Sequence, residues 1–367
     1  MPPAPHGTQP GFQPAIARTR VRKAAAMPEP TPTSVTQIPG VFAAHATLAE
    51  GGTGCTVIVC PKGATGGVDV RGGSPATRET DLLRPEETVQ VLNAVVLSGG
   101  SAYGLAASCG VAEELERQGI GLNVGAGVVP IVSSACLFDL PVGDFSSRPG
   151  IGEGAEATRR ALASQGVPLE RGCVGAGTGC TVGKLAGPGR AMKSGVGECV
   201  LCSADLVCGA VSAVNALGNV CDPDTGEAIA GTLSPDGTRV ADACELLLDA
   251  NERSGFSKTA EENERANAAR RPAPRTNTTI SCVVTNARLT KAQATKVAQM
   301  SADAYAHAIR PTHTTSDGDT VFVMATGDVD ATLDVVGVLA TRALELAIAD
   351  AARSAWGAYG LKAAADL

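Results

Sequence analysis

The chain has 367 residues, of which 44% are hydrophobic, 18% are charged and only 3% are aromatic. This length allows one large domain or two ordinary ones, with a core built mainly from Val, Ala, Leu and Ile. The formal net charge of −7 offers no basic field to phosphate backbones, and few aromatic rings are available to stack on bases. We therefore expect neither a nucleic-acid partner nor, since no run of eighteen apolar residues occurs, a membrane span.

The N-terminal region is proline-rich and basic and lacks the apolar segment of a secretory signal. We predict a flexible arm over residues 1–36, a single domain over 37–367 and a cytoplasmic location. In a chain without an export signal, the twelve scattered cysteines are expected to be mostly buried free thiols. Cys199 and Cys202 have the spacing of some zinc ligands, but no recognisable second pair or nearby histidine accompanies them, so no metal is expected.

Strands and helices follow one another along the domain. Short apolar runs closed by turn residues predict strands at 54–61 and 94–100, and helical spacing predicts a helix over 101–119. The same criteria predict strands at 198–202 and 206–215, helix 240–255, strand 279–285, helix 290–309, strand 320–326 and helix 329–353. Residues 251–277 are polar, contain two prolines and lack an apolar stripe, which predicts a mobile linker.

The sequence matches several common catalytic motifs only in part. The segment TGCTVGKL has Thr178 and Leu185 where a phosphate-binding loop requires Gly and Ser or Thr. Four histidines are little material for a Ser-His-Asp triad, and His313 is connected to a candidate site only through the nearby Asp317.

The junction between Asn277 and Thr278 separates the predicted linker from a predicted buried strand. A threonine there is an ordinary strand former. The alternative is that the Asn277–Thr278 bond is cut, so that Thr278 becomes a new N-terminus. Its α-amine, with an ordinary pKa of about 7.7–8.0, is then able to take the proton of its own hydroxyl.

Two segments carry a resemblance to a known family. NTTISCVVTNARLTK (277–291) and AIRPTHTTSDGDTVFVMATG (308–327) resemble the self-cleaving family of L-aminopeptidase/D-esterases, β-peptidyl aminopeptidases and nylon-oligomer endohydrolases. GCTVIV, VDVRGG, LSGGSAYGL, VPIVSSACLFDL and GAGTGCTVGK resemble the same family, over about residues 37–355. The N-T-T start and the D-G-D pair look most similar to the nylon-oligomer branch. The resemblance implies a four-layer α/β/β/α sandwich of the N-terminal-nucleophile hydrolase type.

The resemblance also implies catalytic roles. Thr278 is expected to be the nucleophile, first against the carbonyl of Asn277 and then against the substrate. Lys184 is expected to lower the pKa of the new amine and orient the hydroxyl. Asn215 is expected to donate a hydrogen bond to the oxyanion.

Further residues complete the expected site. Asp317 and Asp319 are expected to accept hydrogen bonds from the new amine and hydroxyl, and either could serve as the base before the amine exists. Phe138 stands where family members often have Tyr. Ser133, Ser134 or water is then expected to replace the missing hydroxyl in the substrate pocket.

Self-cleavage is expected to yield chains 1–277 and 278–367, which stay associated and form oligomers, often tetramers, of the two-chain unit. No cofactor is required. Expected substrates are short peptides, amino-acid amides or ω-amino-acid oligomers such as nylon fragments, and exo- and endo-action both remain open. The alternative is an uncleaved, non-catalytic relative that acts as a ligand-binding or assembly protein.

Overall fold

The long strand β2 (Thr53–Val70) belongs to two layers of β-structure. Its first part pairs with β1 (Phe42–Leu48) and β4 (Leu92–Ser98), and its last part pairs with β16 (Thr320–Val329). The ladder with β4 is irregular between Val59 and Ala64, where Pro61 lacks an N–H and Gly63 has a φ of +81°. This interruption lets one strand pass from the first layer to the second.

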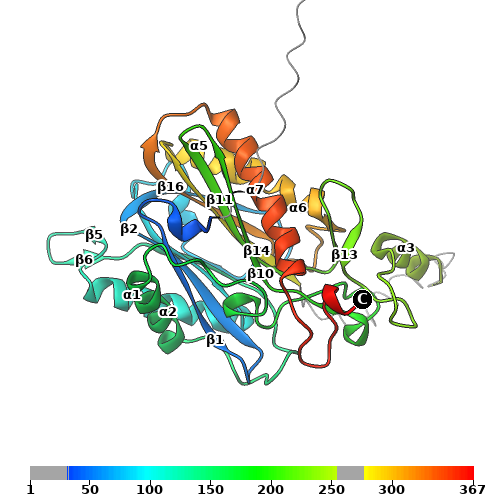
Figure 1. The fold of residues 1–367 in the computed structure, drawn as a ribbon. Helices are drawn as coiled ribbons and strands as arrows, with labels where there is room; N and C mark the ends of the chain where they lie inside the picture. Colours follow the sequence, from blue (N-terminus) through cyan, green and yellow to red (C-terminus); the bar gives the residue numbers. More distant parts are fainter. Residues whose placement is uncertain (1–30, 32, 254–276) are drawn as a thin grey trace, which may run out of the picture.

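The structure is a computed structural model that describes residues 31, 33–253 and 277–367 (Figure 1). The first layer adds β7 (Val132–Cys136) and β3 (Thr77–Arg78). The second layer adds β10 (Val196–Ser203), β11 (Leu206–Asn215) and β14 (Thr278–Ala287), with β14 between β11 and β16. Side chains alternate along β14: Ile280, Cys282 and Val284 pack between the layers, and Val283 faces the helices.

Helices cover the outer face of each layer. The first layer carries α1 (Ala107–Arg117) and α2 (Ile151–Ala163), and the second carries α5 (Lys291–Ser301), α6 (Asp303–Ala308) and α7 (Leu333–Arg353) (Figure 1). The remaining elements are α3 (Ala243–Arg253), β5 (Leu122–Asn123), β6 (Val128–Val129), β8 (Thr181–Val182), β9 (Met192–Lys193), β12 (Asn219–Cys221), β13 (Ala228–Ala230) and β15 (Ile309–Arg310). The α/β/β/α sandwich implied by the resemblance is confirmed.

The predicted elements recur with changed limits. The helix expected over 101–119 begins as a 3-10 helix (Ser101–Ala106), and Gly100 and Ser101 at its start adopt positive φ angles. The helix expected over 290–309 is divided at Ala302 into α5 and α6. All twelve cysteines lie in the described part and are free, most of them buried, as predicted.

The boundary of the N-terminal arm needs correction. Residues 1–30 and 32 lie outside the described part, but Val35 is fully buried. The hydroxyl of Ser34 and the N–H of Val35 both donate to Glu198 Oε2, at 2.9 and 3.0 Å. Val35 is buried and both residues bind the partly buried carboxylate on the edge strand β10, so the packed domain begins before residue 37. Most of the predicted linker, 254–276, also lies outside the described part.

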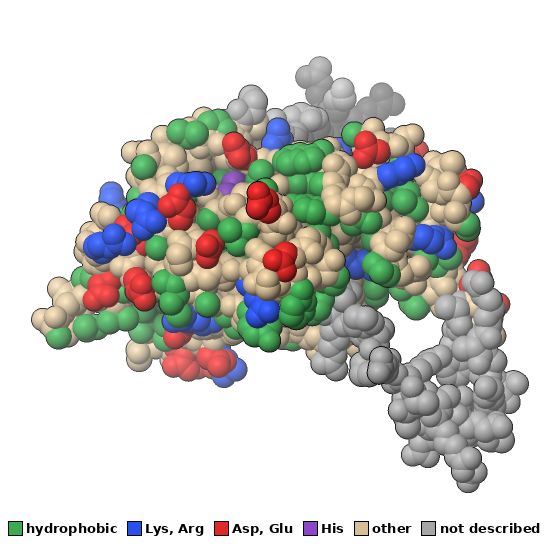
Figure 2. Space-filling model, turned by 90° about the horizontal axis from the view of Figure 1, so that it is seen from below, with side chains coloured by type: hydrophobic (Ala, Val, Ile, Leu, Met, Phe, Trp, Pro, Cys, Tyr) green, Lys and Arg blue, Asp and Glu red, His purple; other side chains and the backbone are tan. Residues whose placement is uncertain are grey.

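Charged side chains of both signs are present on the visible face of the molecule (Figure 2). On the face in Figure 2, acidic and basic side chains are interspersed with apolar and uncharged groups. No helix in the described part of the chain combines the length and apolarity that crossing a membrane requires.

Candidate active site

The end of β11 and the start of β14 meet at one edge of the second layer. Asn215, the last residue of β11, is the direct antiparallel partner of Thr278, the first residue of β14. Both side chains are buried. Because Thr278 is in phase with Ile280 and Cys282, its side chain is directed between the two layers.

The hydroxyl of Thr278 is enclosed by two backbone segments. Thr278 Oγ1 donates to the carbonyl oxygen of Asn277, in the peptide bond that precedes it. On another side lies Gly318, where an added Cβ would be 2.8 Å from Thr278 Oγ1 and 2.9 Å from the carbonyl oxygen of Ser74. Glycine at this position therefore allows the Asp317–Asp319 turn to approach the hydroxyl.

Lys184 holds Asn215 in place. Its Nζ donates to both the carbonyl oxygen and Oδ1 of Asn215, each at 2.8 Å, and the N–H of Thr181 donates to the same Oδ1 at 3.0 Å. Asn215 Nδ2 donates to the carbonyl oxygen of Phe138 at 2.9 Å. These bonds define which end of the amide carries the N–H donors.

The environment of Lys184 changes its ionisation. The residue is partly exposed, but its ammonium end lies inside the protein, and this burial lowers its pKa to about 7. The negative charge of Asp317 acts in the opposite direction without cancelling the effect of burial. Lys184 is therefore divided between its charged and neutral forms near pH 7.

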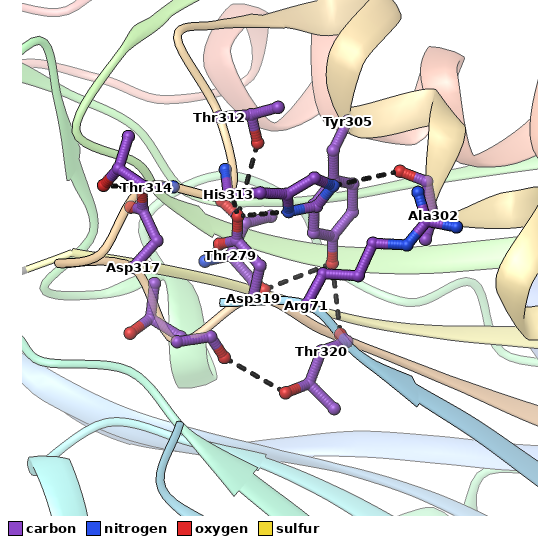
Figure 3. A network of polar contacts seen from close by, with 12 residues as sticks. Arg71, Thr279, Ala302, Tyr305, Thr312, His313, Thr314, Asp317, Asp319 and Thr320 are labelled. Carbon is purple, nitrogen blue, oxygen red and sulfur yellow. Dashed lines mark hydrogen bonds and ion pairs between the residues drawn. The ribbon is translucent and has the colours of Figure 1, made fainter. Parts of the chain in front are cut away.

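The two aspartates of the D-G-D turn are held differently (Figure 3). Asp319 Oδ1 accepts from the N–H of Thr279 at 2.8 Å, and Oδ2 accepts from the N–H of His313 at 3.1 Å. Asp317 Oδ2 accepts from the N–H and the hydroxyl of Thr314, whereas its buried Oδ1 has no hydrogen-bond partner among the described residues. Burial, and then the charge of Asp319, raise the pKa of Asp317.

The VDVRGG segment (68–73) and the serine after it are hydrogen-bonded to the backbone of this turn. The N–H groups of Arg71 and Gly72 donate to the carbonyl oxygen of Asp319, and that of Ser74 donates to Asp317 O. An added Cβ at Gly72 would lie only 2.3 Å from the backbone nitrogen of Asp319. The glycine is thus required for close backbone contact.

Some predicted site residues are placed elsewhere. The backbone of Phe138 reaches Asn215, as described above. The Ser133 hydroxyl instead donates to Glu79 O at 3.2 Å, and that of Ser134 donates to the Ser108 hydroxyl at 3.4 Å.

Sequence reasoning overlooked Tyr305 and connected His313 to the site through the wrong aspartate. Tyr305 is fully buried, and its hydroxyl lies 2.7 Å from Ser281 Oγ and donates toward the carbonyl oxygens of Thr279 and Thr320. His313 reaches the site through Asp319 rather than Asp317, with its Nδ1 2.9 Å from Asp319 Oδ2. The buried position of Tyr305 on an amphipathic helix resembles that of any core residue, so no local signal identifies it.

The site offers carboxylates, a lysine and a hydroxyl for chemistry. Within the described ranges, no group of three or more His, Cys, Asp or Glu side chains is arranged to hold a metal ion.

Comparisons with known proteins connect this geometry to a family. The model of peptidase family S58 matches residues 33–362. An uncharacterized aminopeptidase of Mycobacterium leprae is 40% identical over 313 residues, which cover 82% of this chain and 80% of the relative. A 6-aminohexanoate-oligomer endohydrolase of Kocuria sp. is 30% identical over 294 residues, covering 80% of this chain and 74% of that protein.

The fold has a counterpart among solved structures. The L-aminopeptidase D-Ala-esterase/amidase of Ochrobactrum anthropi, described as a variant of the Ntn hydrolase fold, superimposes with a TM-score of 0.60. It is 16% identical, and the match covers 90% of this chain and 89% of that one. This likeness supports the fold assignment.

Proposed function

Because the chain belongs to peptidase family S58, we propose that it is a self-cleaving amide hydrolase whose nucleophile is Thr278. The observation that carries this proposal is the contact between the Thr278 hydroxyl and the carbonyl oxygen of Asn277. Nucleophile and target bond are thus adjacent before any cleavage has occurred.

Self-cleavage begins when Thr278 Oγ attacks the carbonyl carbon of Asn277. Asp317 takes the hydroxyl proton, because its Oδ1 is the buried carboxylate oxygen without a partner among the described residues. The C–N bond to Thr278 then breaks, the nitrogen leaves as an amine after protonation, and an ester joins Asn277 to Thr278 Oγ. Water hydrolyses the ester and leaves a carboxylate on Asn277.

Substrate hydrolysis reuses the same group. The new α-amine of Thr278 accepts the proton of its own hydroxyl, which attacks the substrate amide and forms an acyl-enzyme that water resolves. Asn215, oriented by Lys184 and by the Phe138 carbonyl, stabilises the oxyanion with its amide N–H. Asp317 Oδ1 accepts a hydrogen bond from the amine.

The two chains stay associated through non-covalent contacts after cleavage. Residues 278–367 contribute β14 and β16 to the second layer, and β14 pairs with β11 of the other chain along its length. Separation would break this ladder and expose the core. Assembly of these two-chain units into oligomers such as tetramers is part of the proposal, and light scattering on the processed protein measures it.

The substrate class follows the relatives. Their names point to peptides for one branch and to 6-aminohexanoate oligomers for the other, so we propose a short linear amide as substrate. Release of amine from an amino-acid anilide indicates aminopeptidase action. Internal cleavage of a linear 6-aminohexanoate oligomer indicates endo-action.

Denaturing mass spectrometry tests self-cleavage. The wild type is expected to give chains of residues 1–277 and 278–367, and Thr278→Ala is expected to remain intact. Thr279→Val is the matched control, because the Thr279 hydroxyl is buried and makes no hydrogen bond among the described residues. Cleavage of Thr278→Ala at the same bond would refute the nucleophile. An intact, inactive wild type would favour a ligand-binding or assembly protein.

A further inference from the structure

His313 lies next to Asp319 of the D-G-D turn, and each of its ring nitrogens has a hydrogen-bond acceptor nearby (Figure 3). Nδ1 lies 2.9 Å from Asp319 Oδ2, and Nε2 lies 3.4 Å from the carbonyl oxygen of Ala302. The ring stacks on Tyr305 with centroids 5.3 Å apart. A neutral imidazole has one N–H donor, whereas the imidazolium has two, so only the charged ring donates to both acceptors.

The backbone of His313 is also committed to Asp319. Its N–H donates to Asp319 Oδ2 at 3.1 Å, and its φ of +53° is a left-handed conformation that costs free energy in residues with a side chain. His313 therefore binds the Asp319 carboxylate through both its backbone N–H and its ring.

Asp319 in turn contacts Thr279, the residue that follows the proposed nucleophile. Its Oδ1 accepts from the N–H of Thr279 at 2.8 Å, and the carbonyl oxygen of Thr279 accepts from the hydroxyl of Tyr305 at 3.2 Å. Both polar backbone groups of the residue after Thr278 are thus held by the His313–Asp319–Tyr305 cluster.

We propose that His313 is a positioning residue that acts as an imidazolium through Asp319 to hold the start of β14, and with it Thr278, in the reactive position. The proposal rests on the proposed function of Thr278. The ring of His313 is hydrogen-bonded to Asp319 and Ala302 and is directed at these two groups, so the role proposed for it is positioning and not proton transfer.

The charges around His313 determine its response to pH. Burial lowers its pKa, but the hydrogen bond and charge of Asp319 and the hydrogen bond to the carbonyl of Ala302 together outweigh burial, so the pKa is raised above its ordinary value of 6.5. The positive charge of Arg71, which is itself paired with Asp69 and Asp303, opposes this rise, and Tyr305 packs against the ring. The linked stabilisation is fully present below about pH 6.5 and is lost as the pH rises through the raised pKa.

Imidazole NMR of the processed enzyme tests the charge directly. The signal of His313 is identified among those of the four histidines by its loss in His313→Asn. His313 is expected to be mainly doubly protonated at pH 6.5, where an ordinary histidine is half protonated. A mainly neutral His313 at that pH overturns the proposal. Because this measurement needs no activity, it is independent of whether Thr278 is the nucleophile.

Kinetics of two variants test the positioning role. His313→Ala is expected to lower kcat at least about tenfold with KM within about twofold, since misplacing a reacting group mainly affects the chemical step. His313→Asn, which tolerates the left-handed backbone, is expected to retain more activity and to lose the decline of kcat that His313 deprotonation causes at alkaline pH. His307→Asn is the matched control on the exposed side of α6.

The outcomes separate the two proposals. Wild-type kcat and pH profile in His313→Ala refute the positioning role while leaving Thr278 in place. If His313→Ala does not fold, the His313→Asn profile and the NMR titration still decide. Cleavage of Thr278→Ala refutes the proposed nucleophile, whatever the charge of His313.

Discussion

Asp317 and Asp319 flank the same glycine, but of these two aspartates only Asp319 has both carboxylate oxygens hydrogen-bonded to described residues. Asp319 is held by Thr279 and His313, whereas Asp317 Oδ1 is buried without a partner there. A buried acceptor that is unsatisfied costs about 1–3 kcal/mol. In the proposed reaction, Asp319 therefore has the positioning role, and Asp317 Oδ1 is the oxygen that accepts a proton or a hydrogen bond from the amine.

Asp317→Asn is expected to slow self-cleavage by about 10² or more, the usual contribution of a general base. Stability at neutral pH is not expected to fall. Burial and Asp319 raise the pKa of Asp317, so the charged form destabilises the folded state above that pKa, and the amide removes this effect. Cleavage time courses and urea unfolding at pH 7 measure the two effects. Asp319→Asn, the comparison, is expected to lose activity and stability together; equal losses in both variants would contradict the division of roles.

Gly318→Ala places a methyl group 2.8 Å from Thr278 Oγ1 and 2.9 Å from Ser74 O. We expect self-cleavage to be blocked or at least tenfold slower, with about 1–3 kcal/mol of destabilisation from overpacking. Mass spectrometry and thermal unfolding check this. Gly152→Ala is the control, because its added Cβ meets no atom within 4 Å and it lies in α2, where Ala favours the helix. Normal cleavage by Gly318→Ala would show that the turn does not confine the hydroxyl.

Asn215→Ala removes the proposed oxyanion donor. Loss of one such donor lowers kcat by about 10²–10³, which we expect for substrate hydrolysis by any processed enzyme obtained. Asn286→Ala is the control, because Asn286 is also a buried asparagine. Its side-chain amide is hydrogen-bonded to the N–H of Val207 and the carbonyl oxygen of Asp205, near the opposite end of β14. The control is expected to lose stability and keep its kcat. A fall in kcat of similar size in both variants would argue against an oxyanion role.

Lys184→Met tests the buried ammonium through pH. The pKa of Lys184 is lowered to about 7 in the folded protein, against 10.5 ordinarily. Burial of the charged ammonium therefore lowers the free energy of unfolding by its full amount below pH 7. This loss of stability disappears as the pH rises from about 7 to 10.5, where the folded protein carries the neutral amine. The variant is expected to become less stable relative to wild type as the pH rises over that range. Urea unfolding at pH 6 and pH 9.5 measures the slope, with Lys62→Met as a surface control. Parallel curves would contradict the buried position of the charge.

Local patterns predicted most elements of this fold but not all their limits. The run from Ile280 to Val284, which follows the predicted linker, identified β14, and helical spacing identified α7, because each signal lies within one element. The break at Ala302 escaped prediction. So did the packing of Ser34 and Val35, since it depends on contacts with the distant Glu198. The layered architecture came from the resemblance.

The sequence by itself determined the candidate cut at Asn277–Thr278, the family and the residue types available for chemistry, since these depend on local spacing and motif. Only the tertiary structure decided that Asn215 faces Thr278, that Asp317 and Asp319 are held differently, and that His313 and Tyr305 support the site. The physical reason is that strand register and burial arise from pairing between distant segments. Such pairing sets which polar atom meets a partner and which is left open, and no single segment encodes it.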